Sequence, residues 1–278
     1  NTTIEQQILA DYGVLPQVGE KGSVFSGQQL PFTGPSDLVS FLQAELGGLQ
    51  GSYGVYVRHL GTGEEVSWND RTSFTAASTA KLFVVGAYYR QLEKDPSFAD
   101  KDIVLQSEDY ISGSGSLINE SVGAVYDSRI LIEKMLKESD NTAFAMMIRT
   151  LGVRKIIDFI KTTGLKDTDF LTNNTTPHDL GIFFDKLYNN ILFTKDHTKE
   201  FLLLMQDTLF EDRIPLYLPD DVVVSHKIGT WSGAYSDAGI VFTKEKGDYV
   251  ITIMTENVPY DQSVRTMREL SKIIYDYF

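Results

Sequence analysis

The chain has 278 residues, of which 42% are hydrophobic and 23% charged, so it can bury a large core in one domain or in two closely joined lobes. Its formal net charge of −13 argues against binding to nucleic acid or to an anionic membrane surface, because both need basic side chains. The absence of cysteine excludes disulfides, thiolate chemistry and cysteine-ligated zinc.

The sequence offers no pattern for a metal or a membrane span. The four histidines are scattered without metal-ligand spacing, and none forms an evident pair with a serine; they are His59, His178, His197 and His226. No apolar run reaches the roughly 18 residues that a membrane-spanning helix needs. We therefore expect no metal, no organic cofactor and no membrane span in this chain. A start at Asn1 rather than methionine is compatible with an upstream signal or anchor that has been removed.

Residues 1–35 are expected to form an N-terminal arm or linker. A short helix fits Ile4–Tyr12, and a polar stretch punctuated by prolines and glycines follows it. A small packed element is the alternative. Ser36 then serves as a predicted N-cap for an amphipathic helix that Gly47-Gly48 ends.

The next elements are a hairpin and a long helical middle. Two β-rich runs around Gly61-Thr62-Gly63 predict the hairpin. From Ser78 to about Phe210 apolar residues recur at helical spacing, and Thr176-Pro177 is a helix-start signal. We assign these stripes to the core rather than to a cofactor site; they are Leu131–Leu136, Ala143–Leu151, Ile156–Ile160 and Leu180–Tyr188.

Strands return near the end of the chain, and a last helix follows them. The strands are predicted at 222–227, 235–243 and 249–255, and the final helix carries one apolar face with Val264, Met267, Leu270 and Ile274. The simplest packing is an α+β fold in which an antiparallel sheet contains strands from both ends of the chain. Terminal helices cover this sheet lobe (36–75 and 218–278), and a helical lobe (76–217) is inserted in it. A cleft between the lobes is the natural place for a site.

One pair in this frame suggests chemistry. Ser78 precedes Lys81 by three residues, which places both side chains on one helix face. A serine with a base in reach, near a helix N-terminus, has the arrangement of a nucleophile. Alone, the pair would more simply be an N-capping serine and a solvated lysine. The apolar flanks, from Phe74 to Val85, instead indicate a buried helix.

Two further motifs follow in order: Ser139-Asp140-Asn141 between two helical stretches, and Lys227-Ile228-Gly229 at the end of a predicted strand. Ser139-Asp140-Asn141 alone would be a plain helix cap. Together the three motifs resemble the Ser-x-x-Lys, Ser-Asp-Asn and Lys-Thr-Gly signature of class A β-lactamases and penicillin-binding proteins. The resemblance runs from about residue 36 to 278. It includes GSGSL before the second motif, NTTPHDL after it, and the DAGI strand after the third.

The resemblance implies a role for each matching residue. Ser78 would be the nucleophile, Lys81 would take its proton as a neutral amine, and Ser139 would pass a proton to the leaving nitrogen. The backbone N–H groups of Ser78 and Thr230 would form the oxyanion hole. Substrate binding would fall to Asn141, Lys227, Gly229 and Thr230. Asp140 would support the turn without a chemical role.

Two departures from the family pattern affect the expected reaction. Ile228 stands where the family has a hydroxyl residue, and Thr230 or Ser232 would have to replace it. The loop glutamate that activates water for deacylation in class A β-lactamases has no counterpart in TGLKDTDFLTNNTTPHDL. Glu200 and Glu211 lie too far along the chain to replace it. The other residues that could approach the site are Asp167, Asp169, Asn173 and Asn174.

The expected function is therefore a serine hydrolase in which substrates acylate Ser78 readily and the acyl group is released slowly, because a missing general base costs about 10²–10⁴-fold in rate. Its substrates would be β-lactams or cell-wall peptides ending in a carboxylate. One alternative is a competent β-lactamase with another base, and the other is a non-catalytic module that binds cell-wall peptides. The resemblance further implies an extracytoplasmic protein, and we expect a monomer.

Overall fold

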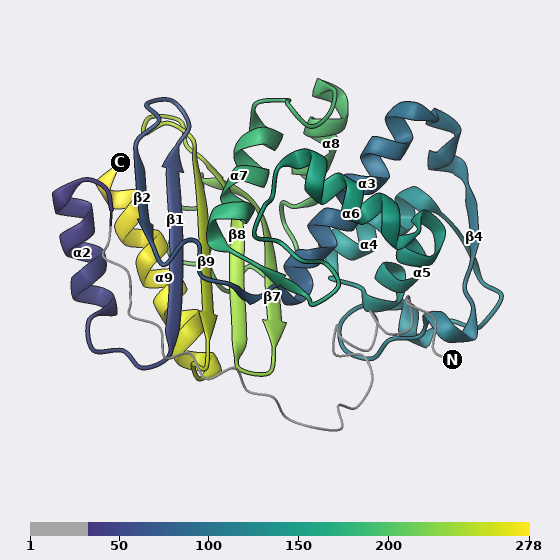
Figure 1. Cartoon of the computed structure of the whole chain (residues 1–278), viewed down its shortest axis with the longest axis horizontal. Helices are drawn as coiled ribbons and strands as arrows, with labels where there is room; N and C mark the ends of the chain where they lie inside the picture. The colour runs from purple at the N-terminus through teal and green to yellow at the C-terminus, as the bar shows by residue number, and fades with distance from the viewer. Residues whose placement is uncertain (1–32) are drawn as a thin grey trace.

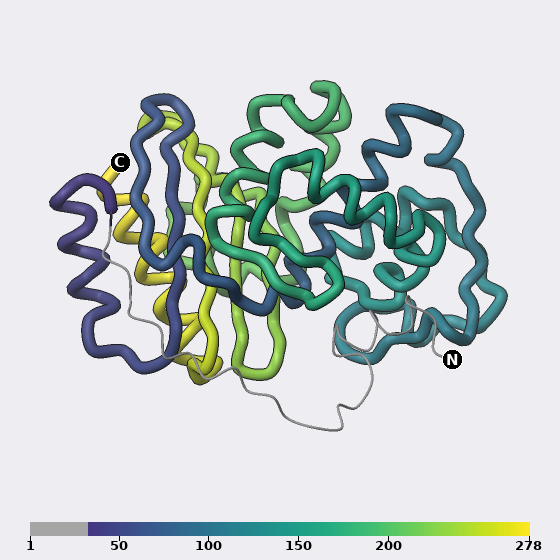
Figure 2. Tube along the Cα trace, viewed as in Figure 1, coloured from purple at the N-terminus to yellow at the C-terminus, as the bar shows by residue number. Residues whose placement is uncertain are grey.

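An antiparallel sheet forms one side of the molecule, and a group of helices forms the other (Figure 1). The computed structural model describes residues 33–278. Five strands are ordered β2-β1-β9-β8-β7, so the N-terminal hairpin joins the C-terminal strands in one sheet. This arrangement confirms the predicted α+β class. The Cα trace leaves the sheet after β2, runs through the helical group and returns at β7 (Figure 2).

The α-helices are α2 (Ser36–Leu46), α3 (Lys81–Lys94), α4 (Ser128–Lys137), α5 (Asn141–Leu151), α6 (Val153–Thr163), α7 (Pro177–Tyr188), α8 (Lys195–Leu204) and α9 (Tyr260–Tyr277). Short 3₁₀ turns are η2 (Ala77–Ala80), η3 (Pro96–Asp100), η4 (Ser107–Asp109) and η5 (Leu117–Asn119). The strands are β1 (Ser52–His59), β2 (Glu65–Trp68), β3 (Phe74–Thr75), β4 (Asp102–Val104), β5 (Val125–Asp127), β6 (Asn174–Thr175), β7 (Val223–Trp231), β8 (Ala234–Phe242) and β9 (Tyr249–Glu256).

The sheet separates two hydrophobic cores because its central strands are buried on both faces. On β9, Ile251 and Ile253 face α2 and α9, whereas Val250 and Met254 belong to the core of the helical group. This alternation follows the two-residue period of a strand. Helices α2 and α9 therefore cover one face of the sheet, and α7 packs against the other (Figure 1).

Local sequence signals set several helix ends. Thr176 caps α7 by accepting a hydrogen bond from the N–H of Asp179, and Pro177 occupies the first helical position. Gly164 ends α6 in the left-handed conformation, with a φ of 83°. Helix α3 carries the longest buried stretch: every residue from Lys81 to Tyr89 is buried, which explains its apolar flanks.

The structure differs from the prediction in two places. Strand β7 is longer than 222–227 and continues to Trp231, because it pairs with β8 down to the tight turn at Gly233. The middle of the chain, predicted as helical, also contains the pairs β4–β5 and β3–β6. The predicted arm at 1–35 falls mostly on residues 1–32, which lie outside the described part. The division into lobes stays a prediction.

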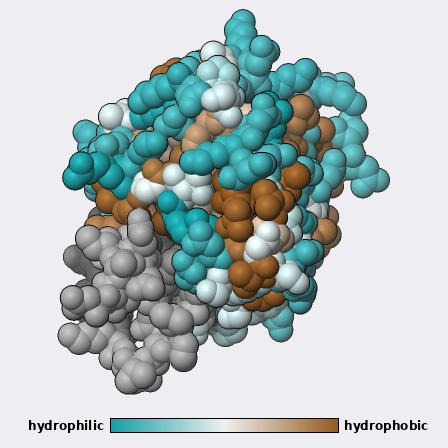
Figure 3. Space-filling view, turned by 90° about the vertical axis from the view of Figure 1, so that its right-hand side faces the viewer, coloured by the Kyte–Doolittle hydropathy of each residue, from teal (hydrophilic) through white to brown (hydrophobic). Residues whose placement is uncertain are grey.

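The helical end of the molecule presents a largely hydrophilic face with one apolar band (Figure 3). Strands β4 and β5 lie at this end, and the register partners Val104 and Val125 are both exposed. Between residues 33 and 278, no helix is long and apolar enough to cross a membrane. The same residues contain no group of three or more histidine, aspartate or glutamate side chains arranged to hold a metal ion.

Candidate active site

A sharp turn presents Ser78 at the start of the central helix. Ser78 lies on η2, one turn before α3, and Ala77 beside it has a φ of 48°. A positive φ is costly for a residue with a Cβ, and such strain concentrates at functional sites. The N–H of Ala76 donates to the carbonyl of Asn173, and the hydroxyl of Thr79 donates to the carbonyl of Ala76. The turn is therefore held from both sides.

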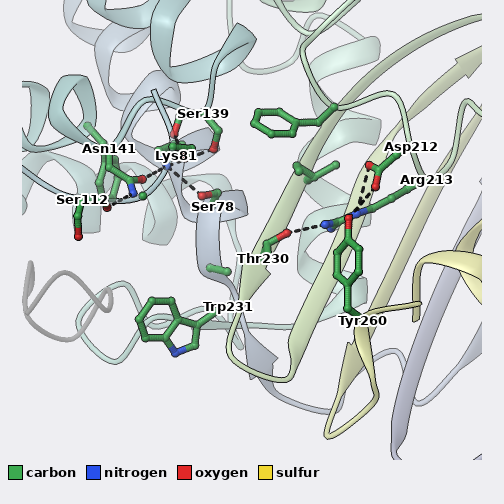
Figure 4. Close-up of a pocket in the computed structure, with 16 residues that line it drawn as sticks. Ser78, Lys81, Ser112, Ser139, Asn141, Asp212, Arg213, Thr230, Trp231 and Tyr260 are labelled. Atoms are coloured by element: carbon green, nitrogen blue, oxygen red, sulfur yellow. Dashed lines mark hydrogen bonds and ion pairs between the residues drawn. The ribbon is translucent and has the colours of Figure 1, made fainter. Parts of the chain in front are cut away.

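Lys81 is the centre of the polar contacts in the site (Figure 4). Its Nζ lies 2.9 Å from Oγ of Ser78, 3.3 Å from Oγ of Ser139 and 2.7 Å from Oδ1 of Asn141. The side chain is buried, and this desolvation lowers its pKa well below the usual 10.5. The positive charge of Lys227 lowers the pKa further, against an opposite effect of Asp140. Lys81 is thus suited to take a proton from Ser78.

The second motif brings Ser139 and Asn141 to this lysine. Ser139 has a φ of 52°, which turns the chain sharply into α5. Asp140 is fully buried, and its carboxylate accepts hydrogen bonds from the N–H groups of Ala143 and Leu117. It acts as the N-cap of α5, so its contacts are those of a turn support. Asn141 is fixed from its other side by donating to the carbonyl of Ser112.

The third motif lies within β7 rather than at its end. Nζ of Lys227 lies 3.0 Å from Oγ of Ser139, so the two lysines share this hydroxyl. Burial lowers the pKa of Lys227 to about 7, with Arg213 acting in the same direction and Asp237 opposing both. A Cβ at Gly229 would come within 2.8 Å of the carbonyl oxygen of Ala76, so glycine allows this strand to approach η2.

A pocket of about 380 Å³ opens beside these groups. Of the predicted residues, the ones that line it are Ser78, Lys81, Ser139, Asn141 and Thr230. Ile228 lines it as well. Lys227 and Gly229 lie behind the wall, because the Lys227 side chain is directed to Ser139 and is only 1% exposed.

Several pocket residues had no signal in the sequence. Arg213 lies in the irregular segment 205–222 with no motif around it, yet its guanidinium is 1% exposed and reaches the wall of the pocket. It donates to the carbonyl of Gly229 at 2.7 Å and to the hydroxyl of Thr230 (Figure 4). The rest of the unpredicted lining includes Phe144, Phe210, Asp212, Trp231 and Tyr260. Only the folded chain brings these segments together.

None of the residues named as substitutes for the loop glutamate lines the pocket, Asn174 included. Asp167 pairs with Arg71, and Asp169 caps its own turn at Leu171. Asn173 meets the Ser78 turn through its backbone carbonyl, not its side chain. The structure places Glu200 within α8, and Glu211 lies against His226 behind the pocket. In the described part of the chain, the one carboxylate on the pocket wall is Asp212.

Comparison with known proteins identifies a matching family and several relatives of this chain. A model of the β-lactamase enzyme family matches residues 37–278. A β-lactamase of Streptomyces lavendulae is 26% identical over 73% of each chain, and one of Streptomyces albus G is 24% identical over 81% of this chain and 80% of its own.

Solved structures share the fold. The structure of PBP-A superposes with a TM-score of 0.84 at 22% identity, covering 90% of this chain and 99% of that one. A β-lactamase of Sphaerobacter thermophilus gives a TM-score of 0.80 at 23% identity, covering 87% and 97%. The match of the family model to nearly all of the described residues decides the assignment: this chain belongs to the β-lactamase enzyme family of serine hydrolases.

Proposed function

We propose that Ser78 forms a covalent acyl-enzyme with β-lactams or with cell-wall peptides that end in a carboxylate. The observation that carries the proposal is the 2.9 Å separation of Lys81 Nζ and Ser78 Oγ in a buried site. Ser78 Oγ attacks the substrate carbonyl while its proton passes to neutral Lys81. Ser139, within reach of both lysines, relays a proton to the leaving nitrogen as the carbon–nitrogen bond breaks.

The oxyanion and the carboxylate of the substrate need separate partners. The backbone N–H groups of Ser78 and Thr230 are proposed to bind the oxyanion, an interaction that typically contributes about 10²-fold or more per donor. Arg213 reaches the pocket wall beside Thr230, and Lys227 lies directly behind it. These two cations are proposed to attract the substrate carboxylate, and Asn141 to bind an amide of the substrate.

Release of the acyl group is proposed to be slow. Hydrolysis of an acyl-enzyme needs a water and a general base beside the ester. Asp212 is the one carboxylate that lines the described pocket, and it already accepts a hydrogen bond from Tyr260 and lies 3.7 Å from Nε of Arg213. Lys81 is then the base that remains. A mutant of PBP-A is known as an acyl-enzyme complex with penicillin G, which supports a penicillin as the probe.

A competent β-lactamase is the second candidate, because the Streptomyces relatives are named as β-lactamases. Its deacylating base would be a group other than a loop glutamate. Both candidates imply a substrate outside the cytoplasm, so we propose an extracytoplasmic location. We separately propose that the protein is a monomer.

Intact-mass spectrometry over time separates these functions. After addition of a penicillin or a cephalosporin, we expect an adduct of the drug's mass that persists for many minutes and is absent in Ser78→Ala. Rapid consumption of the drug without a lasting adduct would support the competent β-lactamase and refute slow release. Neither adduct nor turnover, in a protein with an unchanged circular dichroism spectrum, would leave a binding module.

A further inference from the structure

A buried cluster of charged side chains lies behind the pocket wall, outside the groups assigned to the reaction. His226 on β7 is 1% exposed, and its Nδ1 lies 2.7 Å from Oδ1 of the fully buried Asp237 on β8. Its Nε2 lies 3.3 Å from Oε2 of Glu211, at ion-pair distance. An imidazole between two carboxylates is stabilised in its charged form, because both neighbours favour the imidazolium.

The two carboxylates also hold the chain that surrounds Arg213. Oε1 of Glu211 accepts hydrogen bonds from the N–H and hydroxyl of Thr208, at 2.7 and 2.8 Å. Oδ2 of Asp237 accepts the N–H of Ile214 at 3.0 Å. The residues on either side of Asp212 and Arg213 are therefore both connected to the β7–β8 hairpin through carboxylates that meet at His226.

This arrangement positions Arg213 at the wall of the pocket. Its guanidinium donates to the carbonyls of Gly229 and Ser236 and to the hydroxyl of Thr230. Figure 4 shows the guanidinium running along β7 toward Thr230, with Asp212 and Tyr260 beside it. A shift of the segment would move this cation and leave its two carbonyl partners unsatisfied, a cost expected for buried polar groups.

We propose that His226 is a positioning residue, which joins Glu211 and Asp237 as an imidazolium and so fixes Arg213 for binding of the substrate carboxylate. The inference rests on the proposed function for its effect on acylation. His226 itself contacts no substrate and acts through Arg213. Its effect should therefore be large for substrates that carry a carboxylate and small for those that lack one.

The charges around the ring define the pH range in which the cluster holds. Desolvation alone would lower the pKa of His226, but Asp237 and Glu211 outweigh it and raise the pKa to about 9. Lys227, the next residue in the chain, interacts electrostatically with Asp237 and with Arg213, so these two cations belong to the same network of charges. Because the folded pKa lies above the unfolded value of about 6.5, the stabilisation is complete below about 6.5 and is lost as the pH rises through about 9. At the acid end it is lost as Glu211, whose pKa is lowered despite burial, becomes protonated.

The test replaces Glu211 with glutamine, which keeps the shape and the acceptor for Thr208 but removes the charge. We expect nuclear magnetic resonance of the His226 ring, assigned with His226→Asn, to show imidazolium at pH 8 in the wild type and a lower pKa in Glu211→Gln. The second-order rate constant for acylation by a penicillin should fall by about 10-fold, since small displacements of binding groups are costly. For the penicillin methyl ester it should change less than about twofold.

Glu93→Gln is the matched control. It breaks the other histidine–glutamate pair, in which Nδ1 of His197 lies 3.1 Å from Oε1 of Glu93 on α3, away from the pocket. This variant should leave acylation and the His226 titration unchanged. A neutral His226 at pH 8, equal acylation by the two variants, or an equal loss for penicillin and ester would each overturn the proposal.

A wild-type protein that forms no adduct would refute the proposed function without deciding the role of His226. The Nε–H resonance of Arg213 then decides it. This resonance should shift in Glu211→Gln and stay in place in Glu93→Gln if the cluster positions Arg213, and an unshifted resonance in both variants would refute the inference.

Discussion

The two buried lysines of the site are proposed to act in opposite protonation states. Lys81 is proposed to act as a neutral base, whereas Lys227 is proposed to attract a carboxylate as a cation. Burial lowers the pKa of both, and the mutual repulsion of the two ammonium groups lowers the pKa of Lys81 further. Their shared partner is the hydroxyl of Ser139, which can accept from a charged lysine and donate to a neutral one.

The first prediction concerns the pH dependence of acylation. The second-order acylation constant reports the free enzyme, so it should rise as Lys81 loses its proton and fall as Lys227 loses its own, near pH 7. The profile for a penicillin should therefore be bell-shaped in stopped-flow or mass-spectrometric measurements. Lys227→Arg keeps the charge throughout, because arginine does not titrate in this range, and should lose the falling limb.

A carboxylate-free ester of the same penicillin serves as the control for this profile. It has no charge for Lys227 to attract, so its acylation should keep the rising limb only. A wild-type profile for the free acid that stays flat from pH 6 to pH 9 would show that Lys227 keeps its proton in the folded protein.

At the residue scale, the sequence revealed the side chains that stand in short motifs and missed those that reach the site from irregular chain. The spacing of Ser78 and Lys81 predicts a pair, and the family resemblance adds Ser139 and Asn141. The structure brings the other three within hydrogen-bonding distance of Lys81. Arg213 was not identified, because its position depends on a loop. Ile228, which stands where the family has a hydroxyl residue, lines the pocket.

At the scale of elements, the site depends on how closely β7 approaches η2. β7 is the edge strand of the sheet, and the sequence predicts its end at Lys227. Pairing with β8 carries the strand on to Trp231. The glycine thus marks a close backbone approach rather than a chain reversal, a distinction that the sequence alone does not make.

The second prediction tests this approach with Gly229→Ala. The new Cβ would meet the carbonyl of Ala76 at 2.8 Å and the hydroxyl of Ser236 more closely still, so β7 must move away from η2. The N–H groups of Thr230 and Ser78 would separate, and we expect acylation to slow by about 10²-fold, the effect of one lost oxyanion donor. Rapid mixing with a chromogenic cephalosporin measures the rate.

Gly233→Asn provides the comparison in the turn of the same hairpin. Gly233 has a φ of 76°, which asparagine tolerates, and a Cβ there would have no atom within 4 Å. This variant should acylate at the wild-type rate. If Gly229→Ala also acylated at the wild-type rate, the closeness of β7 and η2 would not be needed for the reaction.

At the scale of the whole molecule, the sheet joins the two cores into one structure. The side chains of β9 alternate between the two cores. If β9 moves out of one core, it therefore also withdraws its side chains from the packing of the other core. The sequence predicted this arrangement in outline, because strands at both ends and helices between them allow few packings. The sequence did not predict the short pairs β3–β6 and β4–β5, because two or three residues carry too little periodicity to identify a strand.

The third prediction is that the molecule unfolds in a single transition, even when the perturbation lies far from the site. Leu270 of α9 is fully buried against the face of the sheet opposite the helical group. Leu270→Ala should lower the free energy of unfolding by about 2–5 kcal/mol through lost contacts and a cavity. Circular dichroism and the fraction of protein acylated by a fluorescent penicillin should fall at the same urea concentration, because the site and the sheet lose structure together.

Phe41→Ala, on the exposed side of α2, is the control and should change the free energy of unfolding by less than about 0.5 kcal/mol. Loss of acylation at a lower urea concentration than loss of circular dichroism would mean that the helical group opens separately, and that the shared sheet does not couple the two cores.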